Sequence, residues 1–146
     1  MSATPLAAYN ALLAEGVINA DPIQAEAMVR LQALDNELPE YGKQMGRKGW
    51  LARLSVAGGR MEPPRGFYLH GGVGRGKTMI MDLFYDYCNI DNSHKQHVHF
   101  HAFMQEVHRR LHSFRQAQKA GKLDKNRDGI SALAKIIADR AWLLCF

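Results

Sequence analysis

The stretch GFYLHGGVGRGKT, residues 66–78, decides the fold of this chain. Its residues 71–78 fit the pattern GxxxxGK[ST], in which a glycine-rich loop leads into a lysine and a hydroxyl residue. The aromatic and apolar run at 67–69 is suited to a buried strand, and residues 79–87 have the apolar spacing of a helix. This order of strand, loop and helix predicts a phosphate-binding loop.

The predicted site runs from the first glycine of the loop into the first turn of the helix. Glycines leave the backbone bare, so that several N–H groups can approach a phosphate together, and the helix directs its N–H groups and positive dipole end at the anion. Lys77 reaches the β- and γ-phosphates, and the Thr78 hydroxyl is the expected metal ligand. The expected cofactors are ATP and Mg²⁺, and the predicted nucleotide-binding residues are Gly71, Gly72, Val73, Gly74, Arg75, Gly76, Lys77, Thr78 and Met79.

A chance match and a kinase-type loop are both less favoured than a phosphate-binding loop. A glycine-rich turn followed by Lys-Thr also arises by chance, but the flanking strand and helix argue against chance here. The glycine loop of protein kinases is excluded, because that loop has no Lys-Thr step that directly opens a helix.

The composition is typical of a globular protein. The chain has 146 residues, of which 47% are hydrophobic and 23% charged, and its length suits one domain. A net charge of +5 permits contact with nucleic acid, but an excess of this size is usually a solvated face, so nucleic acid is not favoured. Cys88 and Cys145 lie in apolar segments without CxxC spacing, which predicts buried, reduced thiols. With neither a leader pattern nor a long apolar run, the expected location is cytoplasmic.

Two capped helices are predicted before the loop. The Thr-Pro pair at 4–5 starts the first, which ends before Gly16. The run Asp21–Gln24 starts the second, with Gln24 as the N3 glutamine of a capping box, and Pro39 ends it. Its apolar stripe, expected to pack on the rest of the domain, is Ile23, Ala27, Leu31, Leu34 and Leu38.

A basic linker with a short helix at 50–56 is predicted over residues 40–64. The linker leaves open a contact with an acidic partner or with lipid headgroups, although such a short helix more often docks on its own domain. The predicted domains are therefore 1–64, an N-terminal helical region and basic linker, and 65–146, which contains the nucleotide-binding loop and which the resemblance described below implies is the amino-terminal half of a P-loop ATPase domain.

The remaining elements alternate between helix and strand, which predicts an α/β fold. The run at 142–146 has the unbroken apolar character of a strand buried on both faces of a parallel sheet. In order, the expected elements are a helix at 77–89, a strand at 97–100, a helix at 101–118 with an apolar side, a basic loop at 119–127, a helix at 128–140 that buries Ile130, Leu133, Ile136 and Ile137, and that final strand.

Six of the seven histidines lie between residues 94 and 112, which raises the alternative of a metal site. His97, His99 and His101 alternate as on one strand face, and His108 and His112 have the i, i+4 spacing of a helical zinc pair. No cysteine is near them in sequence, and no HExxH glutamate follows His108. A polar network or a surface role is favoured instead.

Four segments carry a family resemblance: DPIQ at 21–24, PPRGFYLHGGVGRGKTMIMDLFY at 63–85, HVHFHAFMQEVHRRLH at 97–112 and IIADRAWLLCF at 136–146. Together they resemble the AAA-type ATPases related to the bacterial division protein ZapE and its mitochondrial counterparts. The resemblance implies a three-layer α/β P-loop NTPase core of the AAA type, incomplete here and preceded by N-terminal helices. It also implies that Lys77 and Thr78 hold ATP and Mg²⁺.

The same resemblance implies coupling of ATP hydrolysis to remodelling of a protein partner, such as a division-ring component, and a homo-oligomer in the full-length form. The family's acidic pair follows the strand that ends at Phe146, so no catalytic residue is expected within this chain, which should bind ATP without turning it over. The strands that flank 67–70 in AAA-type sheets also follow, so that segment is expected to lack neighbours. A non-hydrolysing interaction module and a small-molecule kinase, with 119–127 as its lid, remain the alternatives.

Overall fold

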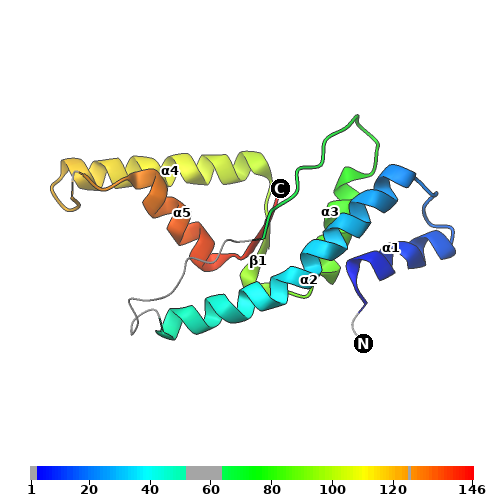
Figure 1. Ribbon diagram of the computed structural model, residues 1–146. Helices are drawn as coiled ribbons and strands as arrows, with labels where there is room; N and C mark the ends of the chain where they lie inside the picture. The colour runs from blue at the N-terminus through cyan, green and yellow to red at the C-terminus, as the bar shows by residue number, and fades with distance from the viewer. Residues whose placement is uncertain (1–2, 52–63, 125) are drawn as a thin grey trace. The chain divides into compact units, whose positions relative to one another are not determined.

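The computed structural model describes residues 3–51, 64–124 and 126–146 (Figure 1). Within it the chain forms two compact units, Met1–Ile90 and Asp91–Phe146, which are described separately below. The predicted domain boundary near residue 64 stays a prediction. None of the described helices combines the length and the apolar composition needed to cross a membrane.

The first unit consists of three helices that contact one another: α1 (Pro5–Ala14), α2 (Pro22–Leu51) and α3 (Lys77–Tyr87). The predicted start of α1 is confirmed, because the Thr4 hydroxyl accepts a hydrogen bond from the N–H of Ala7 at 3.3 Å. Asp21 likewise accepts from the N–H groups of Ile23 and Gln24 at the start of α2. Both are the capping bonds that the orphan N–H groups of a helix start require.

The core of the first unit lies between these helices. Leu31, Leu34 and Leu38 are buried as predicted, but Ile23 is 67% exposed and the fully buried Met28 takes its place. A helical repeat of 3.6 residues places 24, 28, 31, 35 and 38 on one face, so the stripe is turned by about one residue from the predicted one. The other buried apolar members are Pro5, Ala8 and Tyr9 of α1, Ile80 and Phe84 of α3, and Cys88.

Two polar side chains on this same face of α2 contact the two ends of α3. Asp35 is buried and accepts from the N–H of Asn89 at 2.6 Å, just after α3. Gln24 donates from Nε2 to the carbonyl of Arg75 at 3.2 Å, just before α3. Their spacing along α2 matches the 11-residue length of α3, about 16 Å at the rise of an α-helix. The two bonds therefore align α2 and α3 in the same direction.

The prediction that Pro39 ends α2 is wrong, because the helix continues to Leu51. A proline inside a helix lacks the N–H that would bond to the carbonyl four residues back, here that of Asp35, at a cost of about 3 kcal/mol. Burial of the Leu38 side chain next to the proline opposes this cost. The first part of the predicted linker is thus helical, and the predicted helix at 50–56 lies outside the described residues beyond the end of α2.

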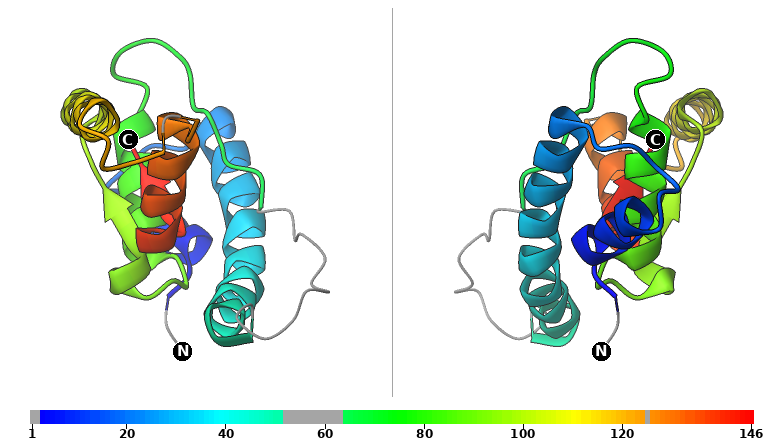
Figure 2. Two further views of the ribbon diagram at one scale, coloured as in Figure 1. Left: turned by 90° about the vertical axis from the view of Figure 1, so that its left-hand side faces the viewer. Right: turned by 90° about the vertical axis from the view of Figure 1, so that its right-hand side faces the viewer.

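The predicted strand at 67–69 is also wrong. Residues 64–72 form neither helix nor strand, and Phe67 and Tyr68 are 44% and 87% exposed. Strand pairing is not local, and the sheet among the described residues contains two other segments. Residues 64–72 therefore lie outside that sheet. Figure 2 shows this segment as a green loop that turns back into the start of α3.

The second unit contains a parallel pair of strands joined by two helices: a 3₁₀ turn at Asn92–His94, β1 (Lys95–His97), α4 (Phe100–Lys119), α5 (Gly129–Arg140) and β2 (Leu143–Cys145). Lys95 pairs with Leu143 and His97 with Cys145. The parallel pairing was predicted, but the first strand ends at His97, and Phe100 already begins α4. Cys88 and Cys145 are both buried thiols, as expected.

The contact between α4 and α5 is close at one point. A Cβ built at Gly129 would lie 2.9 Å from Phe114 Cδ1, so only a glycine allows this approach. Leu133 of α5 is buried as predicted, whereas Ile130 and Ile136 are 66% and 44% exposed. The buried side of α5 is therefore narrower than the four predicted residues suggested.

Asp128 caps α5, and this cap should make stability depend on pH. The Ser131 hydroxyl and the N–H groups of Ile130 and Ser131 donate to its carboxylate and hold the pKa of Asp128 below its ordinary value. The stabilisation is therefore complete above the unfolded pKa, about 4, and is lost as the pH falls through the lower folded pKa. We expect Asp128→Ala to lower the melting temperature at pH 7. In acid, the melting temperatures of the variant and of the unaltered chain should converge. Asp139→Ala on the same helix is the control. A melting-temperature difference between Asp128→Ala and the unaltered chain that stays constant down to pH 2 would contradict this role of the cap.

Asp35 should be important for the stability of the first unit. Asp35→Ala removes the acceptor of the Asn89 N–H, and a lost bond to a charged group costs about 1–3 kcal/mol. Denaturant unfolding followed by circular dichroism measures this loss. Asp35→Asn keeps an acceptor oxygen and should lose less, whereas equal stability of all three proteins would show that the bond contributes nothing.

Candidate nucleotide-binding site

The predicted loop residues 71–76 form an exposed turn that leads directly into α3. Gly74 and Gly76 have φ of 79° and 76°, in the left-handed region that residues with a Cβ rarely adopt. Val73 stands at the tip and is fully exposed, as its 103% relative exposure shows. The glycines are therefore needed here for the loop's conformation as well as for access to its backbone.

The start of α3 is open to an anion. Its N-cap is Gly76, which has no side chain to accept a hydrogen bond from the first turn. The first N–H groups of a helix have no partner within the helix, and together with the helix dipole they attract an anion. Thr78 is exposed in this first turn, and Met79 is half-buried.

Lys77 points into the loop. Its Nζ donates to the carbonyls of Gly71 and Gly72 at 2.9 and 2.7 Å, so two of its three N–H donors hold the loop closed upon itself. The structure thus brings the ammonium, the bare loop backbone and the first turn of α3 together at one place. This is the arrangement expected for a group that neutralises phosphate charge.

The first turn of α2 also contacts the loop, which sequence reasoning missed. Gln24 was predicted as a capping-box glutamine, but its amide donates to Arg75 instead, and the Arg75 side chain lies 3.7 Å from the Asp21 carboxylate. A Cβ built at Gly76 would lie 2.7 Å from Gln24 Nε2. The pair Asp21 and Gln24 was visible in the sequence, but a local helix cap was sufficient to account for it.

The histidines of the described ranges do not assemble into a metal site. His97 ends β1, His99 precedes α4 and His101 lies in its first turn, so the three do not share a strand face as the spacing suggested. His101 and His112 instead pair with Gln105 and Gln116 along the helix, each at 3.2 Å. Nowhere in that part of the chain do three histidine, cysteine or carboxylate side chains gather around one point.

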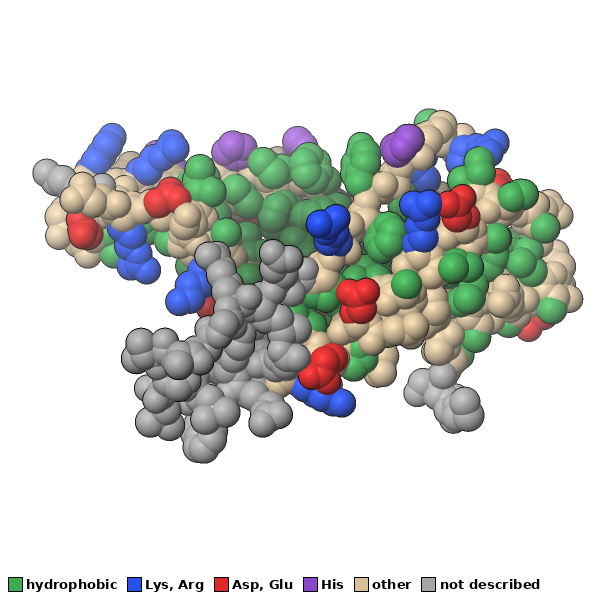
Figure 3. Space-filling view, in the orientation of Figure 1, with side chains coloured by type: hydrophobic (Ala, Val, Ile, Leu, Met, Phe, Trp, Pro, Cys, Tyr) green, Lys and Arg blue, Asp and Glu red, His purple; other side chains and the backbone are tan. Residues whose placement is uncertain are grey.

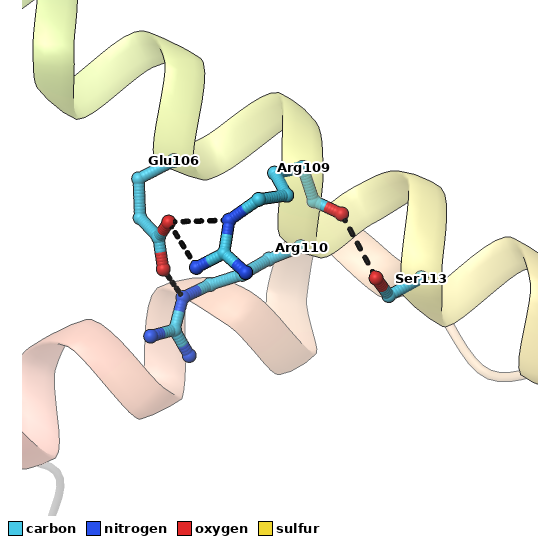
Figure 4. Close-up of polar contacts among 4 residues, drawn as sticks. All are labelled: Glu106, Arg109, Arg110 and Ser113. Atoms are coloured by element: carbon cyan, nitrogen blue, oxygen red, sulfur yellow. Dashed lines mark hydrogen bonds and ion pairs between the residues drawn. The ribbon is translucent and has the colours of Figure 1, made fainter.

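The exposed face of α4 combines histidines with paired charges. Histidine side chains stand along the upper edge of α4 in Figure 3. Glu106 accepts from Arg109 and Arg110, one turn further on, and these bonds hold the pKa of Glu106 below its ordinary value (Figure 4). The Ser113 hydroxyl donates to the carbonyl of Arg109 at 3.1 Å. Such exposed ion pairs contribute little stability, and they neutralise part of the charge of α4.

A glycine-rich loop closed by a lysine at an open helix start is typical of P-loop nucleotide-binding proteins. Residues 3–146 match the family model described as AFG1-like ATPase. The chain therefore belongs to the AFG1-like ATPase family, in agreement with the resemblance found in its sequence.

Several curated relatives support this assignment. The chain is 41% identical over 116 residues to the cell division protein ZapE of Escherichia coli strain K12. This alignment covers 75% of the chain and 30% of ZapE. It is 45% identical over 87 residues to lactation elevated protein 1 homolog B of Danio rerio, and this alignment covers 58% of the chain and 17% of the relative. Over 166 aligned positions it is 32% identical to an uncharacterized Schizosaccharomyces pombe protein, and this alignment covers 98% of the chain and 36% of the relative. The chain thus spans only 17% to 36% of these relatives, and no solved structure matches it.

Gly76 tests how the loop and α2 depend on each other. Gly76→Ala should cost about 1–2 kcal/mol for its positive φ, and about 1 kcal/mol more because the new methyl group displaces the Gln24 amide from Arg75. Gly16→Ala is the matched control, since φ there is 70° and nothing lies within 4 Å. Denaturant unfolding measures both losses. In a Gln24→Ala background the two substitutions should cost the same, and a persistent difference would show that Gln24 is not responsible.

Proposed function

We propose that this chain is the ATP-binding portion of an AFG1-like ATPase that couples ATP hydrolysis to the remodelling of a protein partner. The observation that carries the proposal is the position of the Lys77 ammonium, bonded across the loop at the open start of α3. Membership of the ATPase family supports the choice of nucleotide.

Each proposed site residue has a separate task. The backbone N–H groups of 71–76 and of the first turn of α3 bind phosphate oxygens, while Lys77 exchanges its bonds to Gly71 and Gly72 for bonds to the β- and γ-phosphates. Thr78 is the proposed ligand of Mg²⁺, which bridges the phosphates and neutralises their charge. Val73, Arg75 and Met79 complete the set as loop and first-turn residues in contact with the nucleotide.

The remaining parts of the proposal concern the whole protein, since the chain spans at most 36% of the relatives described above. They are a complete three-layer AAA-type core, hydrolysis of ATP, assembly of copies into an oligomer, and a cytoplasmic location. The name of the Escherichia coli relative points to cell division, so a division component is the proposed partner.

The kinase alternative loses its support. A lid must open and close, but the amide of Gln118, in the last turn of α4, donates to the carbonyls of both Asp124 and Arg127 at 3.0 and 2.9 Å. The proposed lid at 119–127 is thus tied to the helix that precedes it.

ATP binding by the 146-residue chain tests the proposal. We expect saturable binding that Mg²⁺ strengthens, and Lys77→Ala should weaken it about 10- to 100-fold, the equivalent of losing bonds to a charged group. Thr78→Ala should remove most of the dependence on Mg²⁺. Isothermal titration calorimetry measures both, with Lys119→Ala as a control lysine in α4.

A phosphate-release assay on the same proteins separates binding from turnover. Binding without release supports a binding portion of a larger enzyme. Absence of any ATP binding by the folded chain, or equal binding by Lys77→Ala, would contradict the proposed site.

A further inference from the structure

Gln24 is the polar side chain of α2 that lies against the predicted phosphate loop. Its Nε2 donates to the carbonyl of Arg75 at 3.2 Å and would lie 2.7 Å from a Cβ at Gly76. Gly76 immediately precedes Lys77, the proposed phosphate ligand. The amide therefore lies where the loop joins α3, beside the proposed phosphate site.

Most of the hydrogen-bonding capacity of this amide is unused. A glutamine amide has two N–H donors and one carbonyl acceptor, and Arg75 takes only one donor. Gln24 Oε1 is buried, and none of the described residues donates to it. A buried acceptor without a donor is destabilising, which favours any ligand that supplies one.

The orientation of the amide is fixed by its surroundings. The bond to Arg75 assigns the nitrogen to the side of the loop and leaves the oxygen on the other side. Asp21 holds the backbone of Gln24 at 3.4 Å, and the bond of Asp35 to Asn89 fixes α2 alongside α3. A flip of the amide would place an oxygen against the carbonyl of Arg75, so the acceptor and the remaining donor keep their places.

We infer that Gln24 selects adenine as the base of the bound nucleotide. This rests on the proposed function. Oε1 accepts from the exocyclic 6-amino group of adenine, and the second N–H of Nε2 donates to the neighbouring ring nitrogen N7, the two-bond pairing that glutamine makes with adenine elsewhere. The flexible Met79 side chain, whose Cε lies 3.6 Å from the Gly76 Cβ position, is a neighbour that can move to admit the base.

The same amide rejects guanine. Guanine carries a carbonyl at position 6 and an acceptor at N7, so Oε1 would face another acceptor and stay without a donor. A correct two-bond pairing contributes about 1–3 kcal/mol of discrimination, which is about 5- to 150-fold in affinity. This role is separate from holding the loop in place, because a mere brace would affect all nucleotides alike.

Nucleotide analogues test the inference on the unaltered chain, where folding is not in question. ATP should bind about 5- to 150-fold more tightly than inosine triphosphate, which has a carbonyl at position 6, and more tightly than 7-deaza-ATP, which lacks the N7 acceptor. Tripolyphosphate measures the phosphate contacts alone. Competition titration against one labelled ATP analogue gives all four affinities.

Substitutions assign the preference to its residue. Gln24→Ala should make ATP and inosine triphosphate bind equally. Gln32→Ala removes another amide of α2, one that bonds to Leu6 of α1 and to Asp35, and should keep the preference. Equal binding of all bases by the unaltered chain, or a preference that survives Gln24→Ala, would overturn the inference and leave the proposed function intact. If neither ATP nor tripolyphosphate binds, the proposed function itself fails, and the inference fails with it.

Discussion

The first unit depends on the way α2 holds α3 at both ends. Gln24 bonds to the backbone before α3, and Asp35 bonds to the backbone after it. Packing of Met28, Leu31 and the buried side chains of α3 between these two points is apolar and has no direction of its own, so it would tolerate a shift along the helix axis. The two polar bonds do not tolerate such a shift. They set the point at which the loop becomes a helix, and therefore the position of Lys77.

The loop and α3 could be predicted from sequence because their causes are local. A positive φ at Gly74 and Gly76 requires glycine, and the apolar spacing after Lys77 requires a helix. The caps of α1 and α5 are local in the same sense, since Thr4 and Asp128 accept from N–H groups within three residues.

The errors arose where distant residues decide the outcome. Residues 67–69 have strand composition, but a strand exists only with a partner, which composition cannot supply. A proline normally stops a helix, yet α2 continues through Pro39, and burial of the adjacent Leu38 opposes the cost. Gln24 was assigned to a local cap, because nothing in its neighbourhood in sequence indicates a bond to a residue 51 positions away. The sequence therefore predicted the loop of the candidate site but not the contact that Gln24 of α2 makes with it.

The bonds of Lys77 to two loop carbonyls have a consequence for the energetics of binding. The ammonium does not wait in solvent for a phosphate, because Gly71 and Gly72 already accept from it. In the proposed site an anion must compete with these two dipoles, so its affinity is the difference between two sets of bonds to one cation. Until then the two carbonyls act as an internal counter-ligand that keeps the loop closed, and a neutral molecule has no charge with which to displace them from the ammonium.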